Sequence, residues 1–279
     1  MNKKISACVV AAAAFVVATA GAQQAAPDKV TVTLSDPARP ALVKVSLMNG
    51  GITVRGHEGR DVVITTRQRE DDERDSEVPA RAQGMKRIGG SGPGIEVVES
   101  SNVVEIESNS FNRPVDLDIQ VPRRTSLNLS TVNDGDVRVE NVQGEIEVKD
   151  LNGEVTLTGI AGSAVVHALN GEIKVVFSEV SPDKPMSFSS MNGDIDVTFP
   201  AGFKANLVMQ SQNGEVFTDF DVKMETRTSA PAVEDARSKG GKFKVKVDKA
   251  VYGTVNGGGA EVRFKNFNGD IYIRRAAAK

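Results

Sequence analysis

Glycine recurs every nine residues in the middle of the chain, and apolar residues keep fixed positions between the glycines. Residues 134–176 read DGDVRVENVQGEIEVKDLNGEVTLTGIAGSAVVHALNGEIKVV, and the repeated glycines are Gly135, Gly144, Gly153, Gly162 and Gly171. Counted from each glycine, apolar residues fall at positions two, four and seven. Positions two and four share one face of a strand, whereas position seven has the opposite parity. A bend near positions five and six would return position seven to the interior.

This change of parity separates two all-β architectures. Asn-Gly between alternating strands is a strong β-hairpin signal, so an antiparallel meander is one alternative. A bend in every unit instead favours a chain that coils around a core. The residue before glycine alternates in type, because Asp134, Asn152 and Asn170 recur at every second corner, and Gln143 and Ala161 lie at the corners between them. We therefore predict an all-β, parallel β-solenoid with two units and about 18–22 residues per coil.

The corners of such a solenoid have a defined chemistry. Equivalent residues of successive coils stack about 4.8 Å apart, so a column of Asn side chains can form hydrogen bonds along the stack. Glycine beside that column supplies the positive φ that we expect at a corner, and Gly153→Val should cost about 1 to 2 kcal/mol for that reason. The predicted corner residues are Gly50, Gly59, Gly135, Gly144, Gly153, Gly162, Gly171, Gly193, Gly214, Gly269, Asn152, Asn170 and Asn192.

The repeat extends over most of the chain. DLDIQVP at 116–122 matches DIDVTFP at 194–200, and Asn-Gly pairs recur near both ends. Two segments rich in polar residues and glycine interrupt the pattern and are predicted to be loop insertions. The expected organisation is a signal peptide at 1–22, a linker at 23–39, one solenoid domain at 40–275 with insertions at 67–94 and 225–241, and a tail at 276–279.

The N-terminus has the three parts of a secretory signal peptide. Two lysines precede an apolar run at 5–17, and Ala-Gly-Ala then supplies small residues for cleavage before Gln23. An uncleaved membrane anchor is the alternative, but a spanning helix needs about 20 apolar residues. Cys8 stands at the start of the apolar run, whereas a lipoprotein signal places the apolar core before its cysteine. We expect an extracytoplasmic protein, periplasmic, secreted or on the cell surface, with no transmembrane helix in the mature chain.

Composition narrows the chemistry that is available. Cys8 is the only cysteine of the 279 residues, so the mature chain would have no disulfide, no thiolate metal site and no cysteine nucleophile. The formal net charge of −3 gives no sign of a nucleic-acid partner. The absence of Trp and the presence of only two Tyr weigh against sugar binding by aromatic stacking.

The chain resembles a known family at this level of pattern. The signal peptide, the opening NGGITVRGHEG, the DLDIQVP strand and the repeated corners of the form Asn/Gln-Gly-Asp/Glu-Ile/Val are similar to the bacterial exported putative-adhesin family and its head-GIN-like relatives. The resemblance covers roughly residues 40 to 275. It implies an extracytoplasmic β-strand-repeat domain and brings no catalytic motif with it.

Acidic residues are the main candidates for chemistry. Asp136, Glu154 and Glu172 would form a column, because each lies one coil after the previous one, with Glu145 on another side. Paired carboxylates can act as general acid and base when their environments separate their pKa values, as in β-helical polysaccharide lyases and hydrolases. Alternatively, the column is a solvated ladder that deters aggregation, and it could also hold a weakly bound divalent cation.

The remaining polar motifs give weaker signals. His57 and His167 have no ligand partner at a recognised spacing and are interpreted as structural or surface residues. The segment KFKVKV alternates strictly, which predicts a strand with Phe243 inward and with Lys242, Lys244 and Lys246 as a basic stripe. That stripe would either protect a strand edge or contact anionic lipid or polysaccharide.

These observations favour an exported, non-catalytic scaffold without cofactor or metal. Its expected role is adhesin-like interaction in the envelope or at the cell surface, with a protein or a glycan as partner and with self-association through the solenoid ends as a further possibility. The alternatives are a β-helical polysaccharide-active enzyme and an accessory factor in envelope stress signalling.

Overall fold

The computed structural model describes residues 29–68, 94–108, 114–133, 135–225, 232–235, 243–246 and 250–277. Within these ranges the protein contains strands and turns and no helix, so the all-β prediction is confirmed. One sheet of 20 strands accounts for the main body, and β18 (Ala232–Asp235) and β19 (Phe243–Lys246) form a separate antiparallel pair. The predicted signal peptide and most of the predicted insertion at 67–94 lie outside the described residues.

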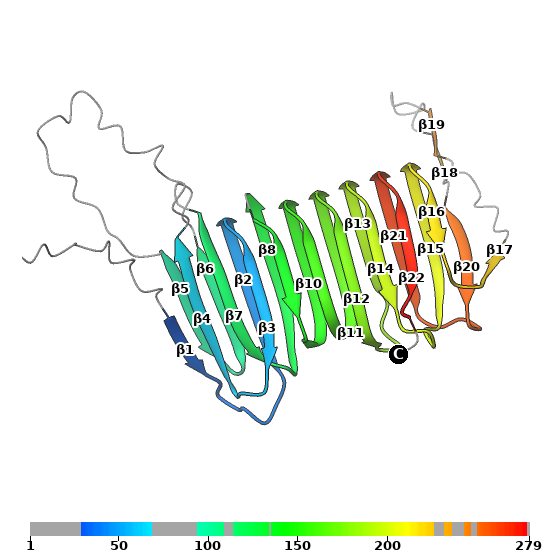
Figure 1. Ribbon diagram of the computed structural model, residues 1–279. Coiled ribbons are helices and arrows are strands. Elements are labelled where there is room, and N and C mark those ends of the chain that lie inside the picture. Colours follow the sequence, from blue (N-terminus) through cyan, green and yellow to red (C-terminus); the bar gives the residue numbers. More distant parts are fainter. Residues whose placement is uncertain are drawn as a thin grey trace, which may run out of the picture.

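The large sheet consists of two stacks of strands that are joined at corners (Figure 1). The first stack runs in the spatial order β5 (Ile95–Ser100), β6 (Val103–Ser108), β2 (Ala41–Asn49), β8 (Thr125–Asn133), β10 (Gln143–Asn152), the second half of β11 (Val155–Asn170), β13 (Met186–Asn192), β21 (Glu261–Asn268), β15 (Ala205–Asn213), β20 (Val251–Val255) and β17 (Val222–Glu225). The second stack runs β1 (Lys29–Thr33), β4 (Asp61–Gln68), β7 (Val115–Pro122), β3 (Ile52–His57), β9 (Val137–Glu140), the first half of β11, β12 (Ile173–Val180), β14 (Ile195–Phe199), β22 (Ile271–Arg275) and β16 (Val216–Thr218).

The central strands pair in parallel, which rules out the antiparallel meander. Gln143 pairs with Ala161, and Ile173 pairs with Ile195, so each residue lies against its equivalent in the next coil. One strand of each stack, joined by a corner, makes one layer of the structure. Antiparallel strands occur at both ends, where β1, β4 and β5 flank the first layers and β17 and β20 flank the last.

The layers do not follow the order of the sequence. The layer of β2 and β3 lies between the layer of β6 and β7 and the layer of β8 and β9, although β7 runs almost directly into β8. The layer of β21 and β22 is inserted in the same way between β13/β14 and β15/β16. Figure 1 shows both insertions, as blue β2 between β6 and β8 and red β21 between β13 and β15.

Each stack has one buried face, and these faces pack against each other. Burial alternates along the strands, as in β7, where Val115, Leu117, Ile119 and Val121 are buried. Such alternation places every second side chain in the core. Valine, isoleucine and leucine fill the early layers, and phenylalanine fills the later ones.

The phenylalanines show how the two faces interlock. Phe177 and Phe199 are stacked in the second stack with ring centroids 5.2 Å apart, and Phe188 and Phe264 are stacked in the first with centroids 5.3 Å apart. Across the core, the rings of Phe188 and Phe199 meet edge to face with centroids 6.5 Å apart. Aromatic rings in these geometries attract each other beyond the effect of burial alone.

The corner between the stacks explains the glycine period. A Cβ added at Gly153 would lie less than 3.0 Å from the carbonyl oxygen of Gly135, and one added at Gly171 would meet Gly153 in the same way. The backbone of each layer therefore rests directly on the backbone of the next. Positive φ occurs at Gly50, Gly162, Gly193 and Gly269 but is not found at Gly153, so the predicted reason for glycine at that position is wrong. Absence of space for any side chain is the actual reason.

Other predicted corner glycines fall into three groups. Gly135, Gly193, Gly214 and Gly269 follow the same column as Gly153, because an added Cβ would meet a corner glycine of the adjoining layer. Gly144 and Gly162 lie at the opposite corner, where an added Cβ on Gly162 would meet the carbonyl of Gly144. Gly59 is not a corner, because it lies in the turn from β3 to the antiparallel strand β4.

Asparagine side chains join the layers beside the glycine column. Asn170 donates from Nδ2 to Oδ1 of Asn152 at 2.9 Å, and Asn192 donates to Asn170 at 2.8 Å. The ladder then continues through Asn268 before it reaches Asn213. The spacing of the Asn-Gly pairs in the sequence predicts that Asn213 is the neighbour of Asn192 in the ladder. That prediction is wrong, because the last layer of the chain, which contains Asn268, is inserted between them. At the other end Asn133 is the member next to Asn152, and Asp134 lies outside the described residues.

A second polar column lies just inside the corner. In four layers a side chain there donates a hydrogen bond to the carbonyl oxygen of a corner glycine in the adjoining layer; the donors are Thr131, Ser190, Asn266 and Ser211. Asp150 occupies the same column, in register with Thr131. Its Oδ1 accepts the backbone N–H of Asn152, whereas its buried Oδ2 has no hydrogen-bond partner among the described residues.

Burial of Asp150 raises its pKa to about 6, and the nearby carboxylate of Asp136 adds to the rise. An ionised carboxylate cannot donate a hydrogen bond, so it cannot do what the other members of the column do. Protonation of Oδ2 would supply the missing donor. Asp150 can therefore act as a donor only when it is neutral, whereas Leu47 and Ala168, in register in the same column, have no side-chain donor.

Two segments differ from the predicted domain organisation. Strand β1 lies inside the predicted linker at 23–39 and pairs with β4. Strand β18 lies inside the predicted insertion at 225–241. The sequence of β1, KVTVT, does alternate, but four of its five residues are exposed, so it lacks the core-facing pattern of the repeat. The sequence of β18, AVED, is too short to show any period.

Replacing Gly171 by alanine should destabilise the fold by about 2 to 4 kcal/mol, because one methyl group must push two layers apart. Equilibrium unfolding in urea measures this change. Gly202→Ala is the matched control, since an added Cβ there meets nothing within 4 Å. An equal midpoint for both variants would contradict the proposed role of close backbone contact.

Replacing Asp150 by asparagine should make stability less dependent on pH. The pKa of Asp150 is about 6 in the fold and about 3.9 in an unfolded chain. The folded state thus binds more protons between these values, and this contribution is complete below about pH 4 and lost as the pH rises through about 6. Relative to the wild type, Asp150→Asn should gain about 1 to 2 kcal/mol between pH 4 and pH 7.5, allowing for solvent screening.

Unfolding free energies across this pH range provide the measurement. Ser190→Ala is the control, because it removes a donor of the same column without removing a titratable group. Its cost should be the same at every pH. A constant difference between Asp150→Asn and the wild type would contradict the role assigned to Asp150.

Candidate functional site

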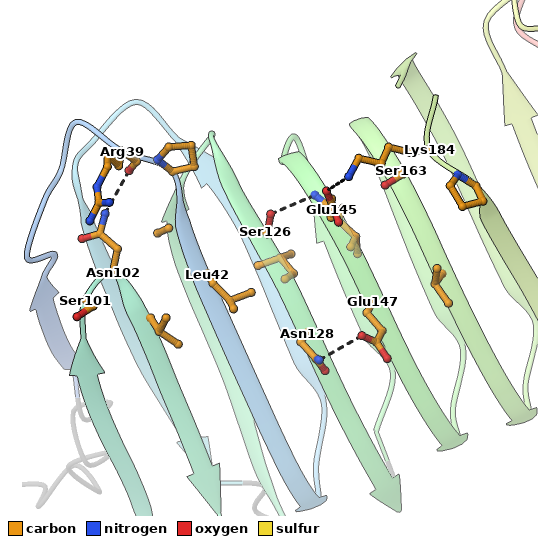
Figure 2. Close-up of a pocket in the computed structure, with 17 residues that line it drawn as sticks. Arg39, Leu42, Ser101, Asn102, Ser126, Asn128, Glu145, Glu147, Ser163 and Lys184 are labelled. Atoms are coloured by element: carbon orange, nitrogen blue, oxygen red, sulfur yellow. Dashed lines mark hydrogen bonds and ion pairs between the residues drawn. The ribbon is translucent and has the colours of Figure 1, made fainter. Parts of the chain in front are cut away.

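An extensive concave surface lies across the outer face of the first stack, where a groove of about 910 Å³ opens to solvent (Figure 2). Its floor consists of outward side chains from β2, β8, β10 and β11, including Leu42, Asn128, Glu147 and Val165. Arg39 and Pro40 form one wall, and Lys184 and Pro185 form the other. We call this surface the groove.

The first wall is fixed to the sheet by a buried asparagine. Asn102, which is 4% exposed, accepts the backbone N–H of Asp36 at 2.7 Å and donates to the carbonyl oxygen of Asp36 at 2.6 Å. Glu99 adds hydrogen bonds from the hydroxyl and backbone N–H of Ser35, which lower the pKa of its carboxyl group. Asn102 has a φ of 65°, a conformation that asparagine tolerates better than most residues. The wall is thus held in place before any partner arrives.

The second wall is attached by an ion pair. Lys184 extends from its loop to Glu145 on β10, and the distance between Nζ and Oε1 is 2.8 Å (Figure 2). The hydrogen bond from Lys184 to Glu145 raises the pKa of Lys184. Both side chains are exposed, so this pair contributes little to stability and can exchange partners readily.

The floor of the groove mixes polar groups with half-buried apolar side chains. Asn128 donates to Glu147 at 3.2 Å, and Ser126 accepts the backbone N–H of Glu145 at 3.2 Å. Glu145 and Glu147 are each engaged with a lysine. The groove offers hydrogen-bonding groups and small apolar positions, and the described residues that line it include no aromatic platform for a sugar. The half-buried apolar positions are Leu42, Val103 and Val165.

The structure separates the four candidate carboxylates. Glu145 lies in the groove, whereas Asp136, Glu154 and Glu172 lie in adjacent layers at the corner. Asp136 accepts the backbone N–H of Glu154 at 3.1 Å through Oδ1 and pairs with Arg138 at 2.8 Å through Oδ2. Glu154 in turn accepts the hydroxyl of Thr156 at 2.8 Å. These carboxylates do not converge on a common point.

The acid that follows the corner glycine satisfies the backbone of the adjoining layer. Besides Asp136, the same contact is made by Asp194 to Asp270 and by Asp270 to Glu215, each at 2.8 Å. Asp116, which follows Val115 and not a glycine, makes an equivalent contact to Gly51 at 2.7 Å. An unpaired N–H group is costly when water cannot reach it, and a carboxylate is a strong acceptor. Recurrence of Asp after glycine is the sequence signal for this role, and it extends beyond the four candidate carboxylates.

Both histidines have local roles. Gly59 donates its backbone N–H to Nδ1 of His57 at 3.0 Å, so Nε2 carries the proton and donates to the carbonyl of Asp61 at 3.0 Å. His57 therefore shapes the turn between β3 and β4. His167 is exposed and its Nδ1 lies 2.6 Å from the hydroxyl of Ser189. No group of three potential metal ligands occurs in the part of the chain that the structure describes.

The predicted basic stripe is described only in part. Lys244 and Lys246 belong to β19, which pairs with β18 rather than with the large sheet. Lys242 lies outside the described residues. In the same described ranges, no helix has the length and hydropathy of a membrane span.

Comparison with known proteins gives one family and several structures. The structure of a putative cell adhesion protein from Clostridium sporogenes has a TM-score of 0.46 at 12% identity, covering 90% of this chain and 100% of that chain. A putative adhesin from Bacteroides fragilis has a TM-score of 0.41 at 9% identity, covering 91% and 98% of the two chains. No curated protein matches the chain.

The family model described as Toastrack DUF4097 matches residues 116–274 of the 279. This range begins at the strand DLDIQVP and includes all the corners from Gly135 onward. The prediction of an adhesin-like β-strand-repeat family is confirmed. Since the match covers more than half of its residues, the chain belongs to the Toastrack DUF4097 family.

Proposed function

We propose that this protein is an exported, non-catalytic scaffold that binds a partner in the cell envelope or at the cell surface. The fold is a parallel β-solenoid whose successive coils are of similar length, and it carries the binding surface on one face. The single observation that supports this role most directly is the groove. The buried Asn102 holds one wall in place, and Lys184 on the other wall is paired with Glu145, so the groove is present without a ligand.

The groove suits an extended polypeptide better than a glycan. Outward side chains of neighbouring strands repeat across its floor, so they offer a partner a row of polar groups with apolar Leu42, Val103 and Val165 among them. A protein segment with alternating polar and small apolar side chains would match this row. Binding of sugars usually relies on aromatic stacking, and no aromatic residue of the described chain lines the groove.

A non-catalytic role is supported by how the carboxylates are used. Asp136 and Glu154 hold the corner, and Glu145 and Glu147 are each paired with a lysine. General acid and base catalysis needs two groups that converge on one substrate bond, with separate tasks. The polysaccharide-active alternative would require a constellation of this kind.

Val165→Arg should weaken binding to the envelope partner at least tenfold, because a long charged side chain then fills the groove and is poorly desolvated there. A photo-crosslinker at position 128 of the intact chain identifies the partner in cells, and the affinity for that partner is then measured in solution. Val176→Arg is the matched control, since Val176 is also a half-buried, outward valine but lies on β12 in the second stack.

Equal affinity of Val165→Arg and Val176→Arg would contradict the groove as the binding surface. Depolymerisation of a polysaccharide by the purified chain, lost on replacement of Glu145 and Glu147 by glutamine, would contradict the non-catalytic proposal. These two outcomes are independent of each other.

The export proposal depends on the N-terminal segment. The chain produced in a bacterial host should be recovered outside the cytoplasm with Gln23 as its first residue, as N-terminal sequencing would show. Replacing two residues of the apolar run at 5–17 by lysine should retain the full-length chain in the cytoplasm, because the segment is then too polar for export. Recovery of uncleaved chain in the membrane fraction would favour the anchor instead.

A further inference from the structure

A column of apolar side chains, four of them exposed and two half-buried, runs along the outer face of the first stack, beside the asparagine ladder. Each member occupies the equivalent position in its layer, because the residues on either side of it pair with their counterparts in the next layer. The members are Met48, Val132, Leu151, Leu169, Met191 and Phe267. Leu151 and Leu169 are each 40% exposed, and Met191 and Phe267 are each 46% exposed. We call this column the axial stripe.

The axial stripe is unusual because its members are contiguous. Single exposed apolar side chains are common on soluble proteins, whereas a connected apolar surface marks an interaction site. The stripe crosses six layers, which corresponds to a length of about 24 Å at the spacing of β-strands. A hollow of about 430 Å³ lies beside Met191 and Phe267, so the surface is not flat. The stripe therefore offers a partner a contoured surface as well as apolar area.

The two sides of the axial stripe carry different charges. On the corner side, the acidic residues Glu154, Glu172, Asp194 and Asp270 follow the stripe layer by layer. On the strand side, the residues two positions before the stripe members are Lys149, His167, Ser189 and Lys265. Over these four layers one flank is acidic, and the other contains two lysines and no acid.

This arrangement is complementary to itself. If a second copy faces the stripe and is related to the first by a two-fold axis parallel to the stripe, the acidic flank of each copy meets the basic flank of the other. A two-fold axis perpendicular to the stripe would instead bring acidic flank to acidic flank. We propose that the axial stripe is the contact between two copies of this chain, with their stacks parallel and with equal layers facing each other.

The geometry specifies the contacts of that dimer. Leu151, Leu169, Met191 and Phe267 each lie opposite their own equivalent in the second copy, as an isologous interface requires. Lys149 of each copy faces Glu154 of the other, and Lys265 faces Asp270. Apolar contact would supply the affinity, and the charged flanks would select the parallel arrangement.

The size of the surface indicates a weak dimer. A contact about 24 Å long that includes both flanks buries on the order of 1,000 Å² in total, at the lower end for specific complexes. Side-by-side association follows from the stripe and is independent of the groove.

Sedimentation velocity of the mature full chain over a range of concentrations tests the dimer. The wild type should show a reversible monomer–dimer equilibrium, and Leu169→Gln with Met191→Gln should weaken it at least tenfold. Met224→Gln with Val251→Gln is the control, because these two exposed apolar residues lie on β17 and β20, away from the stripe. A wild type that stays monomeric, or equal effects of both pairs, would overturn the proposal.

A charge exchange tests the orientation. Lys149→Glu places an acid opposite Glu154 of the other copy, and Glu154→Lys places a lysine opposite Lys149 of the other copy. Each variant alone should lose dimerisation at low salt, and an equimolar mixture of the two should recover it as a heterodimer. Failure of the mixture to associate would overturn the parallel arrangement. Val165→Arg should leave the dimer unchanged, which keeps this test separate from that of the groove.

Discussion

Close contact between backbones at the corner is the constraint on which the rest of this structure depends. Strands of adjoining layers are held about 4.8 Å apart by their hydrogen bonds, and the chain must reverse direction within the same spacing. At Gly153 and Gly171 this leaves no room for a Cβ atom, since it would touch the carbonyl oxygen of the layer beneath. Glycine is required there by space, and only at some corners, such as Gly193, also by a positive φ.

The same contact explains the polar residues around the corner. Tight turns leave backbone groups that the parallel sheet does not satisfy, and side chains from adjoining layers satisfy them. On the outer side of the turn, the carboxylate of Asp136 accepts a backbone N–H group of the adjoining layer. On the inner side, the hydroxyl of Ser190 donates to a backbone carbonyl. Asn170 and its equivalents join the layers directly. Asp150 departs from this scheme, because the inner column needs a donor and an ionised carboxylate has none.

The layers formed by the first and last parts of the chain are inserted between other layers of the stack. The layer of β2 and β3 is held between segments that are adjacent in sequence, and the layer of β21 and β22 is held in the same way at the other end. Each inserted layer shares backbone hydrogen bonds with two neighbours, so neither inserted layer can detach without breaking both sets. A stack ordered in this way provides a rigid base for the groove and for the axial stripe. Surfaces of this kind need little reorganisation on binding.

Short-range repetition was sufficient to predict the all-β fold and the parallel pairing. The apolar positions two and four, and the recurrence of Asn152 and Asn170 at every second corner, follow directly from how a coil must bend and stack. The prediction that position seven is interior is right at Val142 but wrong at Leu151, which is 40% exposed because β10 continues through that position without a bend. Family membership could also be anticipated from the repeated corners, because their pattern is a property of the sequence alone. The acids after glycine were visible as a pattern, although their role as backbone acceptors was not.

Only the tertiary structure decided the order of the layers and the position of the surfaces. Asn268 lies between Asn192 and Asn213 because the last layer is inserted there, and no local pattern records which layers are neighbours in space. The groove likewise depends on segment 35–40 and Lys184, which come from distant parts of the chain. The sequence determined how each coil folds, since that depends on residues a few positions apart. The fold decided which coils meet, since their exposed edges are similar enough to pair in more than one order.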